Sequence, residues 1–83
     1  MDVELLAARL LEIMAKGYPE RLAERYQIDA FTGMDGYELL EAVGRKRGML
    51  VSGGGVNTER AAIAVMDEYR SGKLGRLTLE LPE

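Results

Sequence analysis

The 83-residue sequence contains neither cysteine nor histidine. Without cysteine the chain can form no disulfide and no thiolate zinc site. Without histidine it cannot hold a serine–histidine or cysteine–histidine nucleophilic site, and the usual ligands of transition metals are missing. We therefore expect no catalytic residues and no metal site within this chain.

Proline is scarce as well, and long apolar runs are missing. The chain has two prolines, is 47% hydrophobic and 30% charged, and so has the composition of a folded protein rather than a disordered one. No apolar run approaches the roughly 18 residues of a membrane span. The N-terminus, MDVELLAARL, opens with acidic residues where a signal peptide carries lysine or arginine. We expect a single domain over residues 1–83, monomeric and cytoplasmic, with no membrane partner.

A nucleotide-binding phosphate loop is also missing, although the glycines suggest one. Gly48 and Gly53 have the spacing of the first two glycines of G-x-x-x-x-G-K-[ST]. However, Gly54 and Gly55 then stand where the motif needs the lysine and the hydroxyl that contact phosphate and magnesium. No N-K-x-D motif occurs either. We expect that this chain alone does not hydrolyse nucleotides.

Apolar residues recur at helical spacing in four segments, each with a capping residue or a proline at its start. The pattern predicts helices between Asp2 and Gly17 and over residues 19–26, 36–47 and 58–71. The closing LTLEL (residues 77–81) alternates like a strand but has no partner strand, so we expect an extended tail packed on helices. The predicted fold is all-α, a small bundle of about four helices with an extended C-terminal tail.

Some positions carry more specific expectations. We expect the third helix to bury Tyr37, Leu40 and Val43. Residues 49–51, Met-Leu-Val, are too short for a helix, and we interpret them as an extended, buried linker. Residues 52–55, Ser-Gly-Gly-Gly, are predicted to form a turn that includes Gly53 and Gly54.

Charge is unevenly distributed along the chain. Residues 1–43 hold four basic and nine acidic side chains, whereas residues 44–76 hold seven basic and three acidic ones, within a total net charge of −3. One interpretation is a basic face directed at a polyanion such as RNA. The other is solvated helix faces, with cations that complement helix dipoles. The candidate residues in the basic segment are Arg45, Lys46, Arg47, Arg70, Lys73 and Arg76.

The segment LLEAVGRKRGMLVSGGGVNTERAAIAVMDEYRSGKLGRLTLE, residues 39–80, resembles the C-terminal end of the ribosome biogenesis GTPase A family. The resemblance implies a helical, non-catalytic domain from which the GTPase domain is absent, so GTP and magnesium are implied only for that missing domain. It implies rRNA, the large (50S) ribosomal subunit precursor and the protein's own GTPase domain as partners, late in subunit assembly. The implied rRNA-binding residues are Arg45, Lys46, Arg47, Gly53, Gly54, Arg70, Lys73 and Arg76.

Two other functions stay open from the sequence. The chain could be a helical protein–protein interaction module that docks on its GTPase domain or on a ribosomal protein. The acidic first half and the apolar LTLEL tail favour that alternative. The other open function is that of an enzyme in its own right, which turnover of GTP by the purified chain would support.

Overall fold

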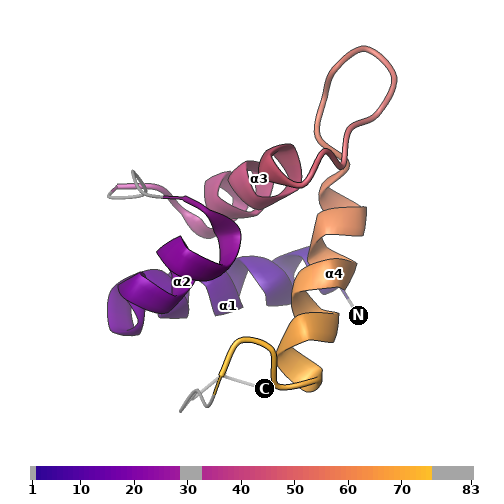
Figure 1. The fold of residues 1–83 in the computed structure, drawn as a ribbon. Helices are drawn as coiled ribbons and strands as arrows, with labels where there is room; N and C mark the ends of the chain where they lie inside the picture. Colours follow the sequence, from indigo (N-terminus) through magenta and orange to yellow (C-terminus); the bar gives the residue numbers. More distant parts are fainter. Residues whose placement is uncertain (1, 29–32, 76–83) are drawn as a thin grey trace.

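The computed structural model describes residues 2–28 and 33–75, and four α-helices account for most of them (Figure 1). They are α1 (Val3–Gly17), α2 (Pro19–Tyr26), α3 (Gly36–Lys46) and α4 (Thr58–Arg70). The all-α prediction is confirmed, and the predicted helix ends agree within one residue. The predicted C-terminal tail lies outside the described residues. None of the described helices has both the length and the apolar character of a membrane span.

The helices begin where short polar side chains satisfy free backbone N–H groups. The Asp2 carboxylate accepts hydrogen bonds from two N–H groups in the first turn of α1. Asp35 and Glu38 form a reciprocal capping box at the start of α3, with distances of 2.8 and 3.0 Å. Asn57 caps α4 through a 3.0 Å bond. Gly72, with a φ of 81°, follows the end of α4.

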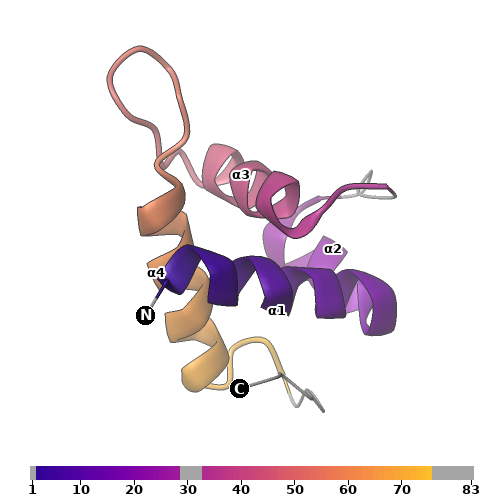
Figure 2. The ribbon, with the colours of Figure 1, turned by 180° about the vertical axis from the view of Figure 1, so that it is seen from behind.

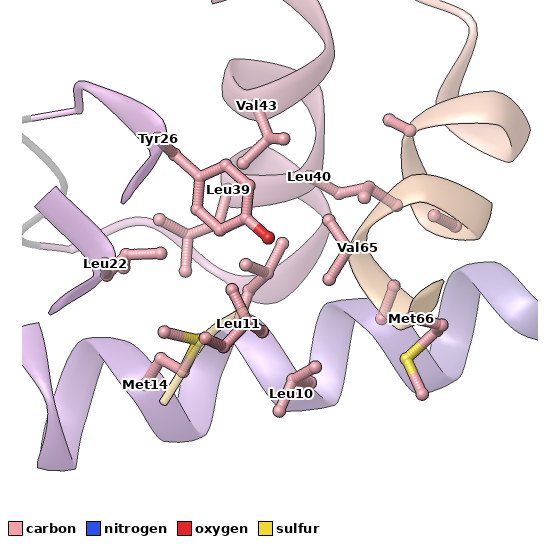
Figure 3. Close-up of a cluster of buried hydrophobic side chains, with 14 of the residues drawn as sticks. Leu10, Leu11, Met14, Leu22, Tyr26, Leu39, Leu40, Val43, Val65 and Met66 are labelled. Atoms are coloured by element: carbon pink, nitrogen blue, oxygen red, sulfur yellow. The ribbon is translucent and has the colours of Figure 1, made fainter. Parts of the chain in front are cut away.

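Helix α1 lies across the molecule and contacts each of the other three helices, while α3 also contacts α4 (Figures 1 and 2). The core therefore lies between α1 on one side and α3 and α4 on the other. Burying each of the larger side chains of this core contributes about 1.5–3 kcal/mol to the free energy of unfolding. Figure 3 shows these side chains, among which the largest that are fully buried are Leu10, Leu11, Met14, Leu22, Tyr26, Leu39, Leu40, Val43 and Val65.

Two glycines of α3 allow close contact with neighbouring elements. A Cβ atom on Gly36 would lie 2.7 Å from the backbone carbon of Ala8 in α1. The N–H of Gly36 also donates a 2.9 Å hydrogen bond to the Glu12 carboxylate. A Cβ atom on Gly44 would lie 3.2 Å from the Cβ of Ala61 in α4. Glycine is required at these positions because a side chain would push the helices apart.

Two predictions about burial are wrong. Tyr37 is 47% exposed, because the buried stripe of α3 runs through Gly36, Leu39 and Val43 and each residue turns about 100° around the helix. Leu50 and Val51 are 51% and 47% exposed rather than buried. They lie in a hairpin loop that projects from the helices (Figure 1), so no second layer covers them.

The hairpin loop closes through backbone contacts. Leu50 forms a single antiparallel bridge with Val56, and the N–H of Val51 donates to the carbonyl of Gly55 at 2.8 Å. The predicted turn is confirmed: Gly53 and Gly54 have φ values of 93° and 90°, in the left-handed region that favours glycine. A Cβ atom on either glycine would meet nothing within 4 Å. The turn thus uses glycine for its backbone conformation and not for packing.

Candidate nucleic-acid interface

The residues proposed from the sequence as RNA contacts occupy three separate places. Arg45 and Lys46 lie in the last turn of α3, and Arg70 and Lys73 lie at the C-terminal end of α4. The glycine turn precedes α4, so the length of that 13-residue helix, about 20 Å, separates it from Arg70. Arg76 lies outside the described residues. The structure therefore does not gather all the candidates on one surface.

The Arg45 and Lys46 side chains line a hollow of about 430 Å³ beside α3, here called the α3 hollow. Its other charged lining residues are Glu41 and Glu38, which lie about one and two turns before Arg45 on the same helix. Two cations thus face two carboxylates, and the charge of the α3 hollow is balanced. Such a balance weakens attraction for a polyanion, since neighbouring carboxylates repel phosphate.

At the end of α4, Lys73 lines two hollows. The α4 hollow, of about 490 Å³, also contains Asp67, Glu68 and Arg70. The α2–α4 hollow, of about 350 Å³, lies between Lys73 and the α2 residues Arg21, Glu24 and Arg25. The α2–α4 hollow thus holds three cations and one carboxylate. Of the three hollows described here it has the most positive lining.

Arg47, the third residue of the basic cluster, points to a different place from its neighbours. Its guanidinium donates two hydrogen bonds to the Glu68 carboxylate of α4, and it lies over the Tyr26 ring, 4.9 Å from the centroid. Its side chain is only 28% exposed. Arg47 therefore joins α3 to α2 and α4, and part of its role is structural.

Glu68 is the centre of this network and is the buried charged side chain among the described residues, at 9% exposure. Besides Arg47 it accepts a 2.9 Å hydrogen bond from the Tyr26 hydroxyl and a 3.4 Å bond from Nε of Arg25. A buried carboxylate without partners would be costly, and here two cations and a hydroxyl compensate it. The network fixes the relative positions of α2, α4 and the end of α3.

The network changes the proton affinity of both buried groups. Burial would raise the pKa of Glu68, but hydrogen bonds from Arg47, Tyr26 and Arg25 outweigh it and hold the pKa below the usual value of 4.5. Burial, and then the hydrogen bond to Glu68, raise the pKa of the Tyr26 hydroxyl. Glu68 is therefore ionised and Tyr26 is protonated at neutral pH.

The lowered pKa of Glu68 makes its contribution to stability depend on pH. The contribution is fully present above the unfolded pKa near 4.5, and is lost as pH falls through the lower folded value. We expect the difference in unfolding free energy between the wild type and Glu68→Gln to shrink as pH is lowered from about 7 to about 3. Urea unfolding at a series of pH values measures this difference. A difference that stayed constant down to the lowest pH would contradict the proposed pairing.

Sequence reasoning missed Glu68, Arg25 and Arg21. A signal for Glu68 was present, because it follows Ala61 and Val65 at the seven- and three-residue spacing of the buried stripe of α4. A carboxylate on such a stripe predicts a buried cationic partner. Nothing in the sequence indicates which cations those are, because Arg25 lies 43 positions away.

The structure defines a small all-α domain with cationic side chains at the ends of its helices. Comparison with known proteins gives its relatives: the chain is 40% identical over 83 residues to a protein of Bacillus cereus named ribosome biogenesis GTPase A. It is 40% and 33% identical over 82 residues to the proteins of that name from Bacillus pumilus and Priestia megaterium. No protein-family model matches the chain.

These matches cover 99–100% of this chain but only 28% of each relative. The chain is thus a relative of the ribosome biogenesis GTPase A proteins and corresponds to a small C-terminal part of them. The resemblance noted over residues 39–80 is confirmed, and it extends to the N-terminal half as well.

Proposed function

We propose that this chain is the accessory RNA- and ribosome-binding domain of a GTPase that acts in late assembly of the large (50S) ribosomal subunit. The observation that carries the proposal is the similarity along the whole chain to proteins named ribosome biogenesis GTPase A. Exposed cations lie at two helix ends, Arg45 and Lys46 on α3, and Arg70 at the end of α4 with Lys73 just after it. Such cations are suited to bind phosphate groups. Catalysis, GTP and magnesium belong in this proposal to the remainder of a longer protein.

Co-sedimentation with ribosomal particles tests the proposal. The 83-residue chain is mixed with precursor and with mature large subunits and pelleted over a salt range of about 50–300 mM. We expect the chain to pellet with the precursor, and the logarithm of its affinity to fall linearly with the logarithm of salt, because bound cations release counterions from phosphates. Absence of binding at every salt concentration would overturn the proposal. Equal affinity for unrelated RNA would remove its ribosomal specificity.

Arg47 does not belong in the variant used to test this binding. Replacing it would leave Glu68 without its closest cation, so lost binding could reflect lost folding. The paired change Arg45→Gln and Lys46→Gln removes two exposed charges without touching that network. It therefore separates RNA contact from stability.

A protein-interaction module is the alternative, and the projecting hairpin favours it. Leu50 and Val51 expose about half of their surfaces on that loop. Apolar side chains presented in this way are suited to a protein partner. This alternative would be favoured over RNA contact if the affinity for the subunit did not change with salt concentration but was lost in the double variant Leu50→Ser, Val51→Ser.

A further inference from the structure

Lys73 joins two neighbouring hollows into one surface. It lines the α4 hollow together with Arg70, and it lines the α2–α4 hollow together with Arg21 and Arg25. Among the described residues the Lys73 side chain has no bonded partner, while its backbone N–H donates a 2.9 Å hydrogen bond to the carbonyl of Glu68. Lys73 is exposed, so its ammonium group lies at the surface, while the backbone that carries it is held by this bond.

The charge on this surface is more positive than its residue list suggests. The carboxylate of Glu68 is shared by Arg25 and Arg47, two cations for one anion, so the paired group keeps a net charge of +1. Two further carboxylates line the joined surface, Glu24 in the α2–α4 hollow and Asp67 in the α4 hollow. Against them stand Arg21, Arg70 and Lys73, so the surface keeps a net positive charge. The α3 hollow, in contrast, sets Glu38 and Glu41 against its two cations. A polyanion is attracted more strongly to the surface around Lys73.

The cations of α2 are held in place before any ligand arrives. Arg25 is bonded to Glu68, and the Arg21 guanidinium lies over the Tyr18 ring, 5.2 Å from the centroid. A Cβ atom on Gly75 would come within 3.2 Å of the Arg21 guanidinium, so the absent side chain leaves room for that group. Side chains that are already ordered lose less entropy on binding.

We infer that the sugar-phosphate backbone of RNA binds mainly across this Lys73-centred surface, with Arg21 and Arg25 of α2 and Arg70 of α4 contacting phosphates around it. The inference rests on the proposed RNA-binding function and moves its centre away from Arg45 and Lys46. It also adds α2, whose segment of the sequence is acidic overall, to the binding surface. Phosphate contacts from two helices fix the orientation of the domain on RNA without reading its bases.

The test compares three double variants of the full chain, each losing two positive charges. Arg21→Gln with Lys73→Gln removes two cations of the Lys73-centred surface. Arg45→Gln with Lys46→Gln empties the α3 hollow of its cations. Arg9→Gln with Lys16→Gln is the matched control on α1, since neither residue lines any of the three hollows. Binding to protein-free large-subunit precursor rRNA and to the intact precursor is measured over a salt series.

We expect the Arg21/Lys73 pair to bind the rRNA about tenfold more weakly near physiological salt, with a salt slope lower by about 1.4–1.8. The α1 control should bind the rRNA as the wild type does. The Arg45/Lys46 double variant should lose only about two- to threefold in affinity. Because Arg21 also contacts Tyr18, Lys73→Gln alone serves as a second variant that leaves this contact intact. It should lose about threefold and lower the slope by about 0.7–0.9, with an unchanged melting temperature.

Each other outcome overturns the inference in an identifiable way. A larger loss in the Arg45/Lys46 pair than in the Arg21/Lys73 pair would return the contact to α3 and leave the proposed function standing. If the wild-type chain bound the intact precursor but not the protein-free rRNA, its partner would be a protein. If the wild-type chain bound neither the intact precursor nor the protein-free rRNA, both the proposed function and this inference would be overturned.

Discussion

Replacing Gly36 by alanine is expected to destabilise the domain by about 3 kcal/mol. The new methyl group would lie 2.7 Å from the backbone carbon of Ala8 and 2.8 Å from a carboxylate oxygen of Glu12. Backbone atoms of a packed helix cannot move aside as the end of a flexible side chain can, so α3 would have to shift away from α1. Urea unfolding followed by circular dichroism measures the loss.

Gly17→Ala is the matched control. Gly17 is the last residue of α1, and a Cβ atom there would meet nothing within 4 Å. Alanine is the better helix former, so Gly17→Ala should leave stability unchanged or raise it by a few tenths of a kcal/mol. If both variants unfolded at the wild-type urea concentration, the contact between α1 and α3 would have to be looser than described.

Replacing Glu68 by alanine is expected to cost about 2–3 kcal/mol of unfolding free energy. The change leaves the Arg25 and Arg47 guanidinium groups and the Tyr26 hydroxyl without their shared acceptor. Breaking a fully buried ion pair by removing one partner costs about 3–5 kcal/mol. The expected loss is smaller here because the Arg25 and Arg47 side chains are 36% and 28% exposed and can recover some hydration.

Asp67→Ala tests whether that loss comes from the network or from α4 itself. Asp67 is the preceding residue on the same helix and is exposed. Its replacement should change stability by less than about 0.5 kcal/mol. Equal losses in Glu68→Ala and Asp67→Ala, compared in parallel urea titrations, would mean that the Glu68 contacts contribute no special stability.

Features fixed by neighbouring residues could be predicted from the sequence. The starts of the helices follow from Asp2, from Asp35 paired with Glu38, and from Asn57, because each side chain bonds to backbone groups within three residues. The glycine turn follows in the same way, since it depends on local backbone angles. These short-range rules were enough to give four helices with nearly correct ends.

Features fixed by packing between distant segments could not be predicted. Arg45, Lys46 and Arg47 are consecutive in the sequence, yet the third turns toward Glu68 while the first two line the α3 hollow. Which side each residue takes depends on how α3 is rotated against α1 and α4. Counting charges along the sequence gives no information about that rotation. The count also assigned Arg25 to the acidic half of the chain, away from the candidate interface.

The central position of α1 has a consequence for how the chain matures during translation. Helix α1 is made first, but its partners α3 and α4 extend to residue 70. Until α4 has left the ribosomal exit tunnel, the side of α1 that it will cover stays open to water, and apolar residues such as Leu10 lack a complete enclosure. The core can therefore close only after α4 has followed the other three helices out of the tunnel, and a mutation in α4 affects folding only at that late step.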